Sequence, residues 1–304
     1  MKEKMNKLVS LDAAISMISD GDKVAIAGSL IRRHPMAVVH EIIRQKKKDL
    51  TLLGWNSGID FDMLIGAGCA KQAHSSYVGL SNLGLAPNFR RALQQDLIRY
   101  VDESETCAID KFRAGAMGAP FAVSKTPLHN DLQKNTEYQT TIVDPFTGEV
   151  WVALKAFRPN VAAMHAHRAD RFGNVQLDRR RMMDNETDML ICKSADKVIV
   201  TVEEIVEEEE IMKTPENTVL SKLFVDAVVL APYGAHPHSC DLRYDFDMEH
   251  ARFYRDMSAT EEGFKQYLDK YVFSCKDWEA YLDKIGKEHL TKITRTDIAE
   301  GERR

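Results

Sequence analysis

Residues 24–35 read Val24-Ala25-Ile26-Ala27-Gly28-Ser29-Leu30-Ile31-Arg32-Arg33-His34-Pro35. The fold class is inferred first from this stretch. Its first four residues are apolar and predict a buried strand that ends at Gly28. Pro35 follows where the first turn of a helix tolerates proline. Apolar residues then recur at helical spacing, at Val38, Val39, Ile42 and Ile43. A strand, a loop and a helix in this order form the repeating unit of a parallel α/β sheet.

The same alternation of strand and helix continues through the first two thirds of the chain. Further strands are expected at 50–53, up to about 78, and at 150–153, 161–164, 197–201 and 227–230, and helices at 89–97 and 106–117. These elements predict an α/β fold built on a doubly wound, mostly parallel sheet. From about Thr260 the pattern is helical and charged, and we expect one domain over residues 1–304.

Residues from about 124 to 150 interrupt this pattern. The segment is polar and irregular and contains Pro127, Pro145 and Gly148. Proline and glycine punctuate local structure and favour turns. We therefore expect an excursion from the sheet, either a small hairpin or a loop subdomain, with strands resuming at Val150.

Composition excludes several classes of partner. The 304 residues carry 41 basic and 46 acidic side chains, a net charge of −5, which argues against a nucleic-acid or acidic-membrane surface. No apolar stretch approaches the ~18 residues of a membrane helix. The N-terminus is charged and no apolar segment follows it, which predicts a cytoplasmic protein. The five cysteines are an odd number without a Cys-x-x-Cys pair, as expected for reduced thiols.

Histidine pairs raise the question of a metal. His165-x-His167 and His236-x-His238, the second with Cys240 nearby, place two imidazoles on one face of an extended segment. Neither pair has a second ligating motif beside it, so we expect no metal. Nucleotide-binding glycine motifs, a Walker lysine and a Gly-x-Ser-x-Gly elbow are also absent from the sequence.

The loop after the first strand is the strongest candidate for binding. It leaves the carboxyl end of a strand, where open α/β sheets bind ligands, and leads into a helix start, which favours anions. Arg32 and Arg33 are expected to grip a substrate carboxylate beside Gly28 and Ser29. The alternative, that these arginines only solvate the loop, has equal weight. Two further candidates for substrate binding are Tyr77, at the end of the third strand, and Ser81, just after it.

Several longer stretches resemble the A subunit of glutaconate CoA-transferase and its relatives. The most specific are Asp60-Phe61-Asp62-Met63-Leu64-Ile65-Gly66 and the run from Val225 to Pro237, which ends in the rigid turn Ala231-Pro232-Tyr233-Gly234-Ala235-His236-Pro237. A third runs from Val272-Phe273 to Gly286. The similarity covers nearly the whole chain, so the sequence is identified as a member of the class I coenzyme A transferase family.

The resemblance implies that this chain is an A subunit, with the active site in the cleft that it forms with a B subunit, in a heterodimer or a dimer of heterodimers. In the family's transferases the nucleophile is a glutamate of the B subunit, which attacks an acyl-CoA and passes CoA to a carboxylic acid. That glutamate lies in a Glu-x-Gly loop, and the candidate here, Glu261-Glu262-Gly263, falls in a helical stretch. The chain is thus expected to lack the nucleophile and to use coenzyme A as a substrate.

A related branch leaves a second function open. The segment Arg32-Arg33-His34-Pro35-Met36-Ala37 is similar to ring-opening hydrolases of steroid breakdown, which cleave a cyclic diketone CoA thioester with water. That branch uses a glutamate of its own A chain, and the matching position is Glu105, or Glu103 if the alignment shifts. A third hypothesis is a scaffold subunit that only shapes its partner's site.

Overall fold

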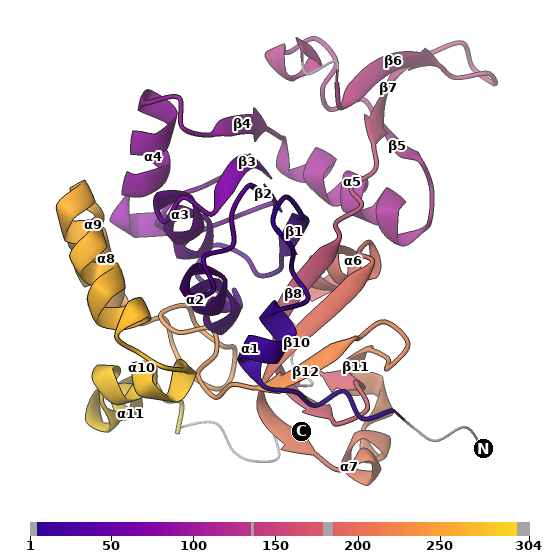
Figure 1. The fold of residues 1–304 in the computed structure, drawn as a ribbon. Coiled ribbons are helices and arrows are strands. Elements are labelled where there is room, and N and C mark those ends of the chain that lie inside the picture. The colour runs from indigo at the N-terminus through magenta and orange to yellow at the C-terminus, as the bar shows by residue number, and fades with distance from the viewer. Residues whose placement is uncertain (1–4, 135–136, 179–184, 297–304) are drawn as a thin grey trace.

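The computed structural model describes residues 5–134, 137–178 and 185–296 (Figure 1). A nine-stranded sheet forms the centre of this part of the chain. Its parallel strands lie in the spatial order β12, β10, β8, β1, β2, β3, β4, and the short strands β9 and β11 extend it antiparallel. The bounds are β1 (Lys23–Ile26), β2 (Leu50–Leu53), β3 (Ala70–Ser75), β4 (Arg99–Asp102), β8 (Val161–Asp170), β9 (Val175–Gln176), β10 (Lys197–Val206), β11 (Thr218–Leu220) and β12 (Ala227–Leu230).

The first strand of the chain lies in the middle of this sheet, and later strands are added first on one side of it and then on the other. From β1 the chain moves outward through β2 and β3 to β4, and it then returns to β8 on the other side of β1. Strands β10 and β12 follow on that side. In such sheets ligands bind outside the carboxyl ends of the strands near the reversal. The predicted doubly wound, mostly parallel sheet is confirmed.

Alternating side chains of β1 separate two cores. Val24 and Ile26 face a core closed by α1 (Leu11–Ile15), α2 (Met36–Arg44), α3 (Ile59–Gly66) and α4 (Pro87–Gln94). Ala25 faces the other core, which is closed by α5 (Glu105–Ala116) and α6 (Asn185–Lys193). Because successive strand residues point to opposite faces, the continuous apolar run of β1 is what a strand buried on both sides requires.

The excursion is a separate three-stranded antiparallel sheet, which projects beyond α5 in Figure 1. It consists of β5 (Phe121–Ser124), β6 (Gln139–Val143) and β7 (Val150–Lys155), with the short helix η2 (Asp131–Lys134) between β5 and β6. The position of the excursion was predicted, but its extent was not. Val150 and the residues after it pair with β5 and β6 rather than with the central sheet.

Helices close the C-terminal part of the chain. They are α8 (Met248–Ser258), α9 (Glu261–Leu268), the π-helical turn η4 (Asp269–Phe273), α10 (Trp278–Ile285) and α11 (Lys287–Ile293). Their aromatic residues pack into the same core as α2 and α3, and Tyr254, Tyr267 and Tyr281 are fully buried there. The remaining short helices are η1 (Ser81–Leu83), α7 (Glu208–Lys213) and η3 (Pro215–Asn217). The predicted helical C-terminus is confirmed.

Two further observations concern the described residues. None of their helices combines the length and apolar character needed to cross a bilayer. All five cysteines are buried free thiols.

Candidate functional site

A hollow of about 520 Å³ lies over the carboxyl ends of β2, β3 and β4. Four loops contribute to it, one after each of β1, β2, β3 and β4, so it occupies the edge at which open parallel sheets bind ligands. All but one of its lining residues carry a polar group in the side chain, and the lining comprises Leu30, Asn56, Ser76, Tyr77, Ser81, Glu103, Ser104 and Glu105.

Tyr77 and Ser81, both predicted to bind substrate, lie in this hollow. The loop that carries Tyr77 is fixed by its backbone, because the Tyr77 carbonyl accepts hydrogen bonds from Ser57 N at 2.9 Å and from Ser75 Oγ at 2.8 Å. The Tyr77 side chain is 37% exposed. A Cβ atom at Gly79 would lie 2.4 Å from the Tyr77 hydroxyl, so only glycine lets the ring fold over this turn. Both side chains are thus available to a ligand.

Gly28 and Ser29 support the hollow without lining it. Gly28 N donates to Asp188 Oδ1 at 2.8 Å, and the Gly28 carbonyl accepts from Trp55 Nε1 at 2.9 Å. Its φ is +108°, and a Cβ atom there would lie 2.7 Å from His34 N. The position therefore requires glycine. Ser29 is buried, and the next residue, Leu30, is the one that reaches the hollow.

Arg32 and Arg33 have a different environment from the one expected. Arg33 is 1% exposed, and its Nη2 lies 2.6 Å from Asp188 Oδ2. Arg32 pairs with Asp241 through two hydrogen bonds, of 3.0 and 2.8 Å. Neither arginine lines the hollow. The structure thus places both guanidinium groups against carboxylates of this chain and outside the hollow, and their contact with a substrate stays a prediction.

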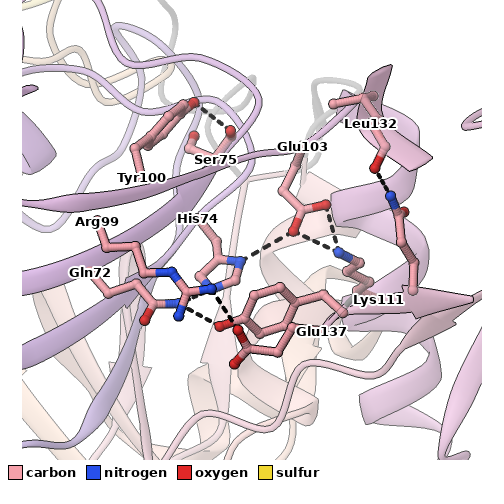
Figure 2. Close-up of polar contacts among 11 residues, drawn as sticks. Gln72, His74, Ser75, Arg99, Tyr100, Glu103, Lys111, Leu132 and Glu137 are labelled. Atoms are coloured by element: carbon pink, nitrogen blue, oxygen red, sulfur yellow. Dashed lines mark hydrogen bonds and ion pairs between the residues drawn. The ribbon is translucent and has the colours of Figure 1, made fainter. Parts of the chain in front are cut away.

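Glu103, which lines the hollow, belongs to a buried ion pair (Figure 2). Lys111 Nζ on α5 lies 2.6 Å from both carboxylate oxygens of Glu103, which follows β4. His74 Nδ1 on β3 lies 3.2 Å from Glu103 Oε1. In Figure 2 Lys111 and His74 approach the carboxylate from two sides. The side chains of Glu103 and Lys111 are 4% and 1% exposed, so the charges are screened from water and compensate each other.

Sequence reasoning named Glu103 but missed Lys111 and His74. Lys111 lies eight residues after Glu103, in the second turn of α5, which starts two residues after Glu103. That spacing was a usable signal. His74 comes from a strand that only the folded sheet places beside β4, through the pairing of His74 with Val101.

Glu105 lines the hollow as the first residue of α5 and is exposed. The preceding residue, Ser104, caps the helix by accepting a hydrogen bond from Cys107 N at 3.2 Å. A carboxylate in the first turn is favoured by the helix dipole, whatever else it does. Glu105 therefore satisfies a structural preference and is also accessible to a bound molecule.

The Glu-x-Gly candidate is far from this edge. Glu261 and Gly263 lie in the first turn of α9, and Glu261 borders a second hollow at the start of β3, beside Gly68 and Lys71. The start of a parallel strand is the opposite edge of the sheet from its carboxyl end. The two hollows therefore cannot share one ligand.

Two groups of described residues have the types and spacing of metal ligands. One joins His165, Glu203 and Cys240, and the other joins His34, Asp60 and His238. The predicted pairs therefore split, because His167 and His236 belong to neither group. Burial and the charge of Glu203 raise the pKa of the Cys240 thiol well above its usual value. Burial also lowers the pKa of His238 well below its usual value, so this imidazole is neutral near pH 7.

The comparison with known families identifies the chain. The model of the family described as Coenzyme A transferase matches residues 8–231. The chain belongs to the coenzyme A transferase family. The A subunit of glutaconate CoA-transferase from Acidaminococcus fermentans is 34% identical over 308 residues, which cover 95% of each chain. The crystal structure of glutaconate coenzyme A-transferase from that organism matches with a TM-score of 0.91 at 32% identity. The match covers 98% of this chain and 97% of the chain in the crystal structure.

Two further relatives are similar to this chain over nearly its full length. The cholesterol ring-cleaving hydrolase IpdA subunit of Rhodococcus jostii is 29% identical over 301 residues, which cover 95% of this chain and 99% of the relative. An uncharacterised protein of Archaeoglobus fulgidus is 36% identical over 300 residues. That match covers 97% of this chain but only 66% of the Archaeoglobus protein.

Proposed function

We propose that this chain is the A subunit of a heteromeric CoA-transferase, which moves CoA from an acyl-CoA such as acetyl-CoA to a carboxylic acid such as glutaconate. The observation that carries the proposal is the state of the glutamates around the hollow. The Glu103 side chain is 4% exposed and is held by Lys111 through both oxygens, so it is poorly placed to attack a thioester. Glu105 sits at a helix start on the exposed rim. The nucleophile is therefore supplied by a partner B subunit.

The reaction then proceeds through acyl exchange on the partner's glutamate. Its carboxylate attacks the thioester carbonyl, the CoA thiolate leaves, and an acyl-glutamyl anhydride forms. The thiolate attacks the glutamyl carbonyl, releases the first acid as its carboxylate and leaves a glutamyl-CoA thioester. The acceptor acid repeats these steps in reverse and leaves as its CoA thioester. No net oxidation or reduction occurs, and splitting the exchange in this way lowers each barrier.

The polar lining of the hollow suits the acid in this scheme. Asn56 and the hydroxyls of Tyr77 and Ser81 offer hydrogen-bond donors in the same hollow. Each hydrogen bond to a charged carboxylate is worth about 1.5–3 kcal/mol. These side chains would orient the acid, while the two arginines after β1 hold the loop in place from beneath.

The first prediction concerns the isolated chain. We expect no CoA transfer by the purified single chain, and activity when it is co-expressed with its B subunit, because the nucleophile belongs to the partner. The measurement follows transfer of CoA from acetyl-CoA to a set of dicarboxylic acids by mass spectrometry. Turnover by the single chain at the rate of the complex would contradict the proposal.

A specific observation also favours a second function. Glu105 is accessible in the hollow, and the chain is similar to the ring-cleaving hydrolase subunit over nearly its full length. In the alternative proposal Glu105 acts as a general base toward a cyclic diketone CoA thioester. A general base contributes about 10²–10⁴-fold in rate, whereas a helix-start carboxylate contributes only about 0.3–1 kcal/mol of stability.

The second prediction separates the two enzymes. In the complex, Glu105→Gln keeps the shape of the side chain and removes its basicity. We expect near-normal CoA transfer and a small change in the melting temperature. Loss of hydrolysis of a cyclic diketone CoA thioester, in a variant with unchanged stability, would instead establish the hydrolase. If the complex turns over either substrate and replacing Tyr77 and Glu105 together leaves the kinetics unchanged, this chain is a scaffold for its partner's site.

A further inference from the structure

Three fully buried side chains from distant parts of the sequence meet behind the hollow. His34 ends the loop after β1, Asp60 lies in the first turn of α3, and His238 lies between β12 and α8. They are 1%, 0% and 1% exposed. One ligand atom from each lies within 4.8 Å of the others. Two imidazoles and a carboxylate are a donor set that binds divalent transition metals.

Polar atoms of this group lack partners among the described residues. His34 Nε2 and His238 Nδ1 are buried without a hydrogen bond, and Asp60 Oδ2 has only the contact with His34 Nδ1. A buried polar atom left without a partner costs about 1–3 kcal/mol, so a group of them at one point needs an explanation. A bound cation would satisfy them together.

The contact between His34 and Asp60 has the geometry of converging ligands. His34 Nδ1 lies 3.0 Å from Asp60 Oδ2, an ion-pair contact that brings two potential ligand atoms to the distance found on one metal ion. Two ligand atoms on one tetrahedral ion, each about 2.0–2.1 Å from it, are separated by about 3.3 Å and point at the ion rather than at each other. The His34 and His238 rings are also adjacent, with centroids 4.7 Å apart.

Neighbouring backbone holds the carboxylate in this orientation. Gly58 N donates to Asp60 Oδ1 at 2.6 Å, which leaves Oδ2 turned toward His34. A Cβ atom at Gly58 would lie 2.6 Å from the Leu30 carbonyl and 3.1 Å from His238 Nε2. Glycine at this position lets the three segments close around one point. Outer hydrogen bonds of this kind orient ligands in metal sites generally.

The second group of potential ligands provides a contrast within the same chain. His165 Nε2 lies 2.6 Å from Glu203 Oε1, and His165 Nδ1 lies 2.9 Å from Thr201 Oγ1. Glu203 also accepts from the Tyr244 hydroxyl and from Tyr233 N. Its donors and acceptors are matched by the protein itself, so nothing there requires an ion.

We propose that His34, Asp60 and His238 bind one divalent transition-metal ion, zinc being the probe that suits these ligands. The site joins the loop after β1, the start of α3 and the segment before α8. Because Leu30 of that first loop lines the hollow, the ion would hold one wall of the hollow in place. The inference rests on the buried contacts alone and does not depend on which acid or thioester the enzyme uses.

The third prediction tests this site by metal content. The full chain is purified without a histidine tag and dialysed against zinc. We expect it to retain one zinc ion per chain, measured by elemental mass spectrometry. Asp60→Asn and His238→Gln are expected to lose it. His40→Gln is the matched control, because His40 is as buried and its ring nitrogens are also unpartnered, but it belongs to neither ligand group. This control is expected to keep the ion.

Thermal denaturation gives a second readout that does not require every variant to be stable. Zinc is expected to raise the melting temperature of the wild type and of His40→Gln, and cobalt is expected to give them visible absorption bands of a tetrahedral site. Failure of the wild type to retain zinc, or equal retention by Asp60→Asn and the wild type, would overturn the proposal. Either result leaves the transferase proposal intact, since that is tested by turnover with the partner subunit.

Discussion

Arg33 shows how a charged side chain of a loop at the sheet edge can be held inside the protein by a buried carboxylate. Its guanidinium is enclosed beneath the loop after β1, 2.6 Å from Asp188, whose side chain is 0% exposed. Asp188 also accepts the hydrogen bond from Gly28 N. One carboxylate of α6 thereby fixes both the glycine at the start of the loop and the arginine near its end. The loop is rigid before any substrate arrives.

The fourth prediction follows from this pairing. Arg33→Ala leaves the Asp188 carboxylate buried and uncompensated, which costs about 3–5 kcal/mol of unfolding free energy. Arg32→Ala is the control, since Arg32 is 24% exposed and its pair with Asp241 is partly in water. For that variant we expect about 1 kcal/mol or less. Urea unfolding measures both. An unchanged midpoint for Arg33→Ala, together with a raised KM for the acid, would instead assign Arg33 to the substrate.

The location of the candidate site residues in the fold was predictable where their sequence position puts them at the end of a strand. Gly28, Tyr77 and Ser81 lie at or just after the ends of predicted strands, and the carboxyl ends of parallel strands meet at one edge. The direction of a side chain is a different matter. Arg33 points inward because Asp188 lies there, and nothing within the loop itself indicates a partner 155 positions later in the sequence.

At the scale of elements, α5 connects the central sheet with the small sheet. Its first turn carries Glu105 into the hollow, and Lys111 reaches Glu103 after β4. Its far end leads into β5. Between the two sheets, Gln72 Nε2 on β3 donates to the Tyr138 hydroxyl at 2.8 Å, beside the start of β6. The small sheet is thus tied to β3 by a partly buried polar contact.

The extent of that small sheet illustrates a limit of local pattern. Residues 150–153 are all apolar, like the strands of the central sheet, and their sequence does not indicate which strands they pair with. Pairing is decided by neighbours: Val150 lies opposite Val143, and Val152 lies opposite both Thr141 and Ser124. The excursion itself was predictable because prolines and glycines near its turns exclude a central strand.

For the whole molecule, the contact between the C-terminal helices and α2 contains a group of buried histidines. His40 on α2 packs its ring against Trp278 and Tyr281 of α10. His236 Nδ1 lies 2.6 Å from the Tyr281 hydroxyl, and His250 Nε2 lies 2.9 Å from the Tyr267 hydroxyl. Burial lowers the pKa of His40 and of His236, and it lowers the pKa of His250 to about 3.

These pKa values make stability depend on pH in a definite direction. Below pH 6.5 each of these histidines binds a proton in the unfolded chain but stays neutral in the fold. The unfolded state then holds more protons, so the unfolding free energy falls as the pH falls, by up to about 1.4 kcal/mol per pH unit for each histidine. Hydrogen bonds from His236 and His289 keep the pKa of Asp247 below its usual value despite burial. This carboxylate therefore adds to the loss of stability only below about pH 4.

The last prediction is therefore acid destabilisation that begins near pH 6.5. We expect the urea midpoint to fall steadily between pH 6.5 and pH 4.5, where carboxylates of ordinary pKa contribute little. His250→Gln keeps a polar end near Tyr267 and removes the titrating group, so its midpoint should depend less steeply on pH, whatever its stability at pH 7.5. The control is His129→Gln, because His129 is exposed and its replacement should leave the slope unchanged. If the urea midpoint depends equally on pH in the wild type and in His250→Gln, His250 is already protonated in the folded protein. The aromatic side chains around it then admit water.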